Sequence, residues 1–261
     1  MKKFVGGAVA LAVTMAVACG ANAAEVIVTD LNPQGWSNPA IENSGGGSSA
    51  ITSASARSGN GSIELFGDRT RWVLGDTPKA LGPGASLGLL SDFTDLSFEY
   101  RIDPTSASNL GAQYSPALRL TVWDGSAKFE YVYERVYQAG GYAGAAAIGA
   151  WNTTTSSSTF YQRVVNTSNN TAPSGTENTQ ATLSDWAAGL SGSAYVTAVY
   201  VGVGSSVGSN YHVYVDNITF GGDTYNFETA VVPEPATWAM MIMGLGAAGS
   251  VLRRRRALAQ A

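Results

Sequence analysis

The stretch Leu96-Ser97-Phe98-Glu99-Tyr100-Arg101-Ile102 decides the fold class, because apolar and polar side chains alternate in it without a break. Successive side chains of a β-strand point to opposite faces of a sheet, so this period of two predicts one buried face and one polar face. We therefore expect the strand to lie in a sheet that packs against a second layer of structure.

The residues that follow repeat the pattern. The stretch 118–122 alternates again, Asp124-Gly125 is typical of a turn, and 129–136 returns, so these segments predict a β-hairpin. One helical turn is expected within 183–190, starting near Ser184. Further strands are expected at 25–30, 63–66, 71–74, 151–158, 160–165, 195–203 and 211–220.

Roughly ten short strands with almost no helix predict an all-β protein, a single antiparallel β-sandwich of the jelly-roll kind. We place this domain at residues 24–230. The Gly-, Ser- and Asn-rich stretches 32–62 and 166–180 are expected to be mostly loop. The sequence shows no repeat of fixed period, which argues against a propeller or a β-helix.

The N-terminus has the pattern of a secretory signal peptide. Lys2 and Lys3 precede an apolar run at 4–18, and the small-residue sequence Ala21-Asn22-Ala23 follows it. We therefore assign residues 1–23 to a signal peptide that is cleaved after Ala23 or Ala24. The alternative is lipidation at Cys19, because Ala16-Val17-Ala18-Cys19 loosely matches a lipobox.

The C-terminal 30 residues have three parts. Val232-Pro233-Glu234-Pro235 is a short extended spacer, 236–252 is apolar, and Arg253-Arg254-Arg255-Arg256 is a cationic stop before the final residues 257–261. The apolar segment would span about 25 Å as a helix, at the short end of what crosses a bilayer. The arginines stay on the cytoplasmic side, which places the sandwich outside.

This order of spacer, apolar helix and arginines resembles the PEP-CTERM sorting signal of exported bacterial proteins. We assign the resemblance to residues 231–256. It implies export by the secretion machinery, anchoring in the membrane through the C-terminal helix, and recognition by an exosortase. The mature protein is then expected at the cell surface or in the extracellular matrix.

Composition narrows the function classes. Between residues 24 and 235 there are nine basic and nineteen acidic side chains, hence a net charge of −10. Such a domain repels phosphate backbones, so nucleic acid is not an expected partner. The chain's single cysteine, Cys19, lies in the leader, which leaves the mature domain without thiolate chemistry or disulfides.

Catalytic patterns are scarce in the mature domain. His212 is its single histidine, and no Gly-x-Ser-x-Gly elbow accompanies it, so a serine triad and a zinc site are not expected. We therefore expect a protein that is not an enzyme. His212 is interpreted as a structural side chain on a strand.

Paired carboxylates are the remaining enzymatic alternative, a secreted hydrolase acting on glycans. Glycoside hydrolysis needs two carboxyl groups about 5–9.5 Å apart. Glu130 and Glu134 lie about 13 Å apart along one strand, whereas a cross-strand pair with Glu99 would fit. The favoured interpretation is a solvated charged face, balanced by the arginines Arg101, Arg119 and Arg135.

Two short motifs resemble the galactose-binding-like jelly rolls used by carbohydrate-binding modules. They are Tyr214-Val215-Asp216-Asn217-Ile218 and Ser58-Gly59-Asn60-Gly61-Ser62. In those folds a structural calcium often sits where the last strand meets an early one. The resemblance therefore implies a calcium ligand at Asp216, with Glu64 or Asp30 supplying opposing oxygens.

Carbohydrate binding also requires exposed aromatic side chains that stack on sugar rings. The odd-numbered aromatics of 129–137 share one strand face and are interpreted as core. Trp36, between Gly35 and Ser37, and Trp151, beside Asn152, are better stacking candidates. The expected function is non-enzymatic binding of, or adhesion to, exopolysaccharide, and a structural matrix component without a specific ligand is a further alternative.

Overall fold

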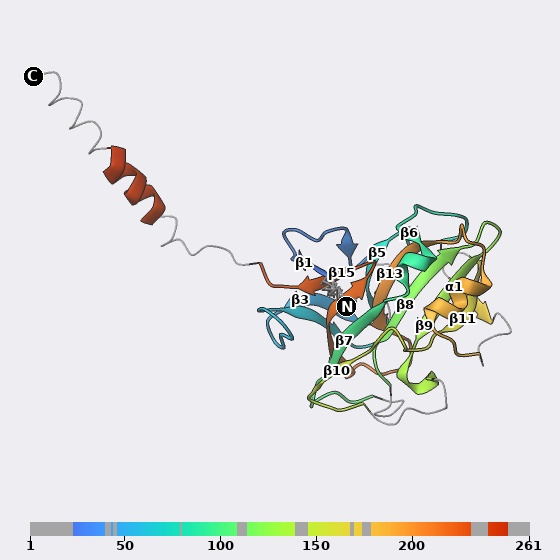
Figure 1. Ribbon diagram of the computed structural model, residues 1–261. Helices are drawn as coiled ribbons and strands as arrows, with labels where there is room; N and C mark the ends of the chain where they lie inside the picture. The colour runs from blue at the N-terminus through green and yellow to red at the C-terminus, as the bar shows by residue number, and fades with distance from the viewer. Residues whose placement is uncertain are drawn as a thin grey trace, which may run out of the picture.

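Two β-sheets pack face to face (Figure 1). The computed structural model describes residues 23–39, 43, 46–78, 80–108, 114–138, 146–167, 170–173, 179–230 and 240–249. Within these residues, one sheet has seven strands and the other has eight. The prediction of an all-β chain is therefore confirmed.

The first sheet is arranged around one central strand. That strand, β14 (His212–Phe220), pairs with β7 (Ser97–Ile102) along one side. Its other side is shared by two strands in succession, β4 and then β15. Besides β14 and β7, this sheet contains β1 (Ala24–Val28), β3 (Ser48–Thr52), β4 (Ser62–Phe66), β10 (Trp151–Thr153) and β15 (Asp223–Phe227).

The second sheet runs in the order β12-β11-β9-β8-β13-β5-β2, and β6 adds to β13. Its strands are β2 (Trp36–Ser37), β5 (Thr70–Gly75), β6 (Gly88–Leu89), β8 (Ala117–Trp123), β9 (Lys128–Tyr133), β11 (Tyr161–Thr167), β12 (Asn170–Pro173) and β13 (Tyr195–Val203). The hairpin predicted around Asp124 is the pair β8–β9, and the Asp124 carboxylate accepts the backbone N–H groups of Ser126 and Ala127 at 2.8 Å.

The core lies between the sheets, as the alternating pattern predicts. Phe98, Tyr100 and Ile102 of β7 are buried, whereas Ser97, Glu99 and Arg101 lie on the opposite, outer face. The Phe98 ring meets the Tyr133 ring of β9 edge-on, with 5.8 Å between their centroids. Within β9 the aromatic stripe is core, as expected, because Tyr131 and Tyr133 are buried and Phe129 packs against the core around them. The expectation is wrong for Tyr137, which lies in the 3-10 turn after β9 and is 48% exposed.

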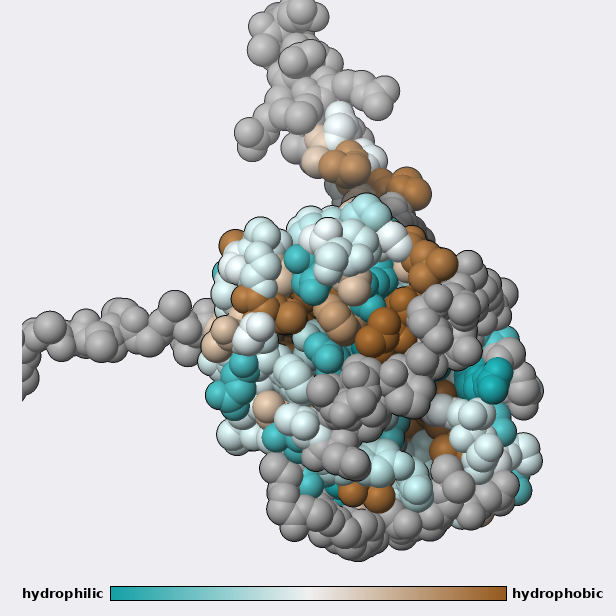
Figure 2. All heavy atoms as spheres, turned by 90° about the vertical axis from the view of Figure 1, so that its right-hand side faces the viewer, coloured by the Kyte–Doolittle hydropathy of each residue, from teal (hydrophilic) through white to brown (hydrophobic). Residues whose placement is uncertain are grey.

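In the described part of the sandwich, helix is limited to short segments. The helix α1 (Leu183–Gly189) falls where it is predicted, and Thr182 and Asp185 cap it reciprocally. Two single 3-10 turns span Leu90–Phe93 and Arg135–Tyr137. Figure 2 looks onto the side of the molecule that carries α1, where brown apolar groups are interspersed with teal and pale polar ones.

Two expectations about the sandwich need correction. It is not fully antiparallel, because β1 runs parallel to β15; strands so distant in sequence need no hairpin between them. The described part of the stretch 32–62 is mostly loop, as expected, and holds the short strands β2 and β3. The polar stretch 166–180 contributes β12, which pairs with β11. In each case long-range pairing overrides local composition.

Part of the predicted tail is described. Residues 240–249 are helical, and their apolar side chains are exposed, with Met240 at 68%. Among the described residues, no helix combines the length and the apolar character needed to span a membrane. The rest of the 236–252 segment, the Pro-Glu-Pro motif, the arginines 253–256, the tail 257–261 and leader residues 1–22 lie outside the described residues.

Candidate functional site: a polar groove on the first sheet

A groove of about 350 Å³ runs across the outer face of the first sheet. Its walls come from β1, β7, β10, β14, β15 and the loop before β4, and every lining residue except Phe98 has a polar side chain. The lining residues are Glu25, Ser58, Ser97, Phe98, Glu99, Thr153, Thr154, Asn217, Thr219 and Thr224. The volume lies within the range of small-molecule sites.

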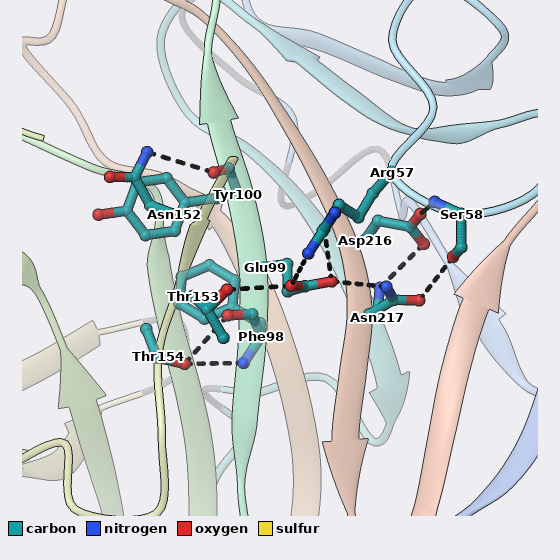
Figure 3. Close-up of polar contacts among 10 residues, drawn as sticks. All are labelled: Arg57, Ser58, Phe98, Glu99, Tyr100, Asn152, Thr153, Thr154, Asp216 and Asn217. Carbon is teal, nitrogen blue, oxygen red and sulfur yellow. Dashed lines mark hydrogen bonds and ion pairs between the residues drawn. The ribbon is translucent and has the colours of Figure 1, made fainter. Parts of the chain in front are cut away.

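Glu99 of β7 is the centre of the polar network in this groove (Figure 3). Arg57 grips its carboxylate in bidentate fashion, with both N···O distances at 3.0 Å. Asn217 donates its side-chain amide at 2.6 Å, and Thr153 donates its hydroxyl at 2.9 Å. Burial opposes ionisation of Glu99, but these hydrogen bonds outweigh it and hold the pKa below its ordinary value. The network thus fixes an ionised carboxylate.

A bulge in β14 brings Asn217 into the groove. The register with β7 shifts between Asp216 and Thr219, and Asn217 has a φ of 47°. Asparagine tolerates this left-handed conformation better than most residues. As a result the Asn217 side chain bridges two elements, because it also accepts the Ser58 hydroxyl at 2.9 Å.

Asp216 lies under the same loop and is fully buried. Its carboxylate accepts the backbone N–H groups of Asn217 at 2.8 Å, Phe227 at 3.0 Å and Ser58 at 3.4 Å. The pKa of Asp216 is nevertheless raised to about 7, mainly by burial and to a smaller extent by the nearby carboxylate of Glu228, while the three hydrogen bonds oppose this rise. The carboxylates of Asp216 and Glu228 therefore lie near each other beside the groove, where both residues are buried.

Glycines allow the loop to close over this corner. A Cβ atom added to Gly59 would lie 1.6 Å from the Glu228 carboxylate, and one added to Gly61 would lie 2.6 Å from the Thr229 nitrogen. The close approach of this loop to residues 228 and 229 therefore requires glycine at positions 59 and 61 of the motif Ser58-Gly59-Asn60-Gly61-Ser62. The structure brings it into contact with the motif 214–218, although the two are more than 150 residues apart.

The predicted sugar-stacking residues have different environments. Trp151 of β10 pairs with Arg101 and is half-buried. It is not among the residues that line the groove, but it lies two residues before Thr153, which does line it. Asn152 points elsewhere and braces a loop through the carbonyls of Ala147 and Ala150. The expectation that Trp36 is exposed is wrong.

Trp36 belongs to the core of the sandwich. It is 2% exposed, and its ring packs edge-on against Phe227 at a centroid distance of 5.2 Å. A buried indole cannot stack on a sugar ring. The glycine beside it, Gly35, has a φ of 85° and serves the turn that leads into β2.

The predicted calcium ligands Asp216, Glu64 and Asp30 do not form one metal-binding cluster. Glu64 of β4 contacts the His212 ring nitrogen at 2.6 Å, and Asp30 is exposed in the turn after β1. The residues that the structure describes hold no cluster of three or more His, Cys, Asp or Glu that could bind a metal ion. The carboxylate beside Asp216 is Glu228, a residue that no sequence motif singled out.

The carboxylate pair of the hydrolase alternative is separated. Glu99 lies on the outer face of the first sheet, whereas Glu130 lies on β9 of the second sheet. Arg119 contacts both Glu130 at 3.4 Å and Glu134 at 3.0 Å, so the charge balance by arginine is present. The expectation that Glu130 and Glu134 lie about 13 Å apart on one strand is wrong, because β9 ends at Tyr133 and both carboxylates reach the same guanidinium group. This face is not solvated at Glu130, which is 0% exposed and also accepts the Tyr200 hydroxyl.

His212 has the environment of a structural side chain. Its second ring nitrogen lies 3.9 Å from the Asp103 carboxylate, opposite the contact with Glu64. The Phe66 and Tyr214 rings pack against it, at centroid distances of 5.3 and 4.9 Å. Its ring contacts in the described part of the chain are thus carboxylates and aromatic rings, with no serine hydroxyl among them.

Comparison with known proteins identifies the tail. A family model for the PEP-CTERM protein-sorting motif matches residues 231–256. No curated protein matches the chain, and neither does any solved structure. The match confirms the predicted sorting signal. It supports an exported protein that is sorted by an exosortase and held in the membrane before cleavage.

Proposed function

We propose that the sandwich is a non-enzymatic carbohydrate-binding domain, which the sorting signal delivers to the cell surface or the extracellular polysaccharide matrix. The groove on the first sheet carries this proposal. Six of its ten lining residues are serine or threonine, and an amide and two carboxylates accompany them. Sugars are recognised through such groups, because each ring presents several hydroxyls that both donate and accept hydrogen bonds.

The arrangement favours binding over chemistry. The Glu99 carboxylate already accepts four hydrogen bonds, from Arg57 (two), Asn217 and Thr153. It therefore orients its neighbours rather than acting as a free base. The Arg57 side chain is 42% exposed and keeps further N–H groups toward solvent. Trp151, two residues before the lining residue Thr153 on β10, is the proposed apolar ring for the C–H face of a sugar.

A structural calcium ion is a second proposal, and it concerns the corner beneath the groove. Asp216 and Glu228 would supply carboxylate oxygens, which are the ligands that calcium prefers. A cation there would stabilise the ionised form of Asp216, which burial and, to a smaller extent, the Glu228 carboxylate disfavour. This assignment keeps Asp216 from the sequence hypothesis and replaces Glu64 and Asp30 with Glu228.

The test is binding of the exported chain to a panel of bacterial exopolysaccharides, with and without calcium. We expect W151A and N217A to weaken binding at least several-fold, because each removes a proposed contact. The control is W123A, which removes a half-buried tryptophan from the second sheet. Equal binding by all variants would overturn the groove assignment.

The same panel distinguishes the alternatives. Product analysis after incubation detects shortened polysaccharide, which would replace the binding proposal by the hydrolase alternative. If the chain neither binds nor shortens any polysaccharide of the panel, the result would favour a matrix component without a specific ligand. Binding with intact polymer supports the proposal.

A further inference from the structure

The sandwich ends very close to the sorting signal. The last backbone contacts of the domain are from Glu228 N–H to the Val28 carbonyl at 2.8 Å and from Thr229 N–H to the Asn60 side chain at 3.0 Å. The matched motif begins at residue 231. The last of these contacts is therefore only two residues before the sorting motif.

A tight turn projects next to this exit. Thr29 and Asn32 exchange backbone hydrogen bonds of 3.0 and 3.1 Å, which places Leu31 at the tip of the turn. Leu31 is 77% exposed, and Ile27 just before it on β1 is 42% exposed. Because Val28 both precedes the turn and bonds to Glu228, the turn and the exit are neighbours. Figure 1 shows β1 beside β15 at this edge.

The length of the connection fixes how far the turn can be from the bilayer. Thr229 and Ala236, where the apolar segment begins, are seven residues apart, which is about 25 Å at full extension. While the chain is anchored, this edge of the first sheet is thus confined near the membrane interface. We propose that Leu31 inserts into the lipid interface beside the anchor and holds the sandwich edge-on to the membrane until sorting.

A tether makes this contact effective. One leucine on a free protein binds lipid weakly, but a short linker converts its insertion into an intramolecular event at high effective concentration. The neighbouring Asp30 is exposed and can remain in the headgroup layer while the leucine enters. The proposal rests on the sorting-signal match and the turn, and it is independent of carbohydrate binding.

The test uses the full chain with Cys19 replaced by serine, so that an introduced cysteine is its only thiol. L31C and L81C are labelled with the polarity-sensitive dye NBD, and the proteins are reconstituted in phosphatidylcholine vesicles. Leu81 is a matched control, because it is 54% exposed and lies on the loop between β5 and β6 of the second sheet, whereas Leu31 follows β1 of the first sheet.

We expect brighter, blue-shifted emission at position 31 that spin-labelled lipid quenches, and neither effect at position 81. No change at position 31, or equal changes at both positions, would overturn the proposal. Because both leucines are exposed, the variants should unfold at the temperature of the parent chain, which thermal melts verify.

Discussion

Replacing Asp216 with asparagine should stabilise the sandwich at neutral pH when calcium is absent. Burial raises the pKa of Asp216 to about 7, against an ordinary value of 3.8. Between these values the folded protein holds a proton that the unfolded chain has lost. Stability from this group therefore falls as pH rises from about 4 to about 7, and the loss is complete above pH 7.

The magnitude follows from the difference between the two pKa values. It corresponds to about 4 kcal/mol at 1.36 kcal/mol per pH unit, a large fraction of the stability of a typical domain. Asparagine has the shape and neutrality of the protonated acid. We therefore expect D216N to raise the melting temperature by about 10 °C at pH 8 and to leave it nearly unchanged at pH 4.

Thermal melts followed by circular dichroism between pH 4 and pH 8, in the presence of a chelator, measure this effect. D30N serves as the control, because Asp30 is exposed and should show no such difference. A wild-type protein that is as stable as D216N at pH 8 would refute the reasoning. Added calcium should stabilise the wild type and not D216N if the ion binds at Asp216 and Glu228.

Three further substitutions test other parts of the sandwich. W36A should lower the free energy of unfolding by about 3–5 kcal/mol in urea titrations, because it empties a buried aromatic site between the sheets. T182A should cost about 1 kcal/mol in the same assay by removing the capping box of α1, whereas the conservative T182S should not. K128M should instead stabilise the protein by about 1–3 kcal/mol. The Lys128 amine is buried without a hydrogen-bond partner in the described residues, and burial lowers its pKa. A loss of stability in K128M would contradict this prediction.

The sequence predicts those parts of the fold that depend on short-range patterns. The alternation in 96–102 defines β7, and the hairpin β8–β9 follows from two alternating runs around Asp124. The burial of Trp36 could not be predicted, because glycine and serine around it indicate a loop. Its position depends on pairing with β5, which begins more than 30 residues later.

The candidate site depends almost entirely on long-range contacts. Arg57 and Glu99 are 42 residues apart, and Glu99 and Asn217 are 118 apart, so no local spacing relates them. Asn217 appears in a short motif, but its role arises from a bulge that the sequence does not reveal. Trp151 could be proposed from its polar surroundings, whereas Arg57 and Thr153 carried no signal of their own.

The parallel pairing of β1 with β15 sets the order in which this protein can be completed during secretion. Ala24 pairs with Asp223 and Val28 with Phe227, so the first strand to emerge from a translocation channel waits for the last. Pairing across almost the whole chain is slow, because a very long loop must close first. β1 can therefore take its place in the first sheet only after residues 223–227, which lie just before the sorting signal, have been made.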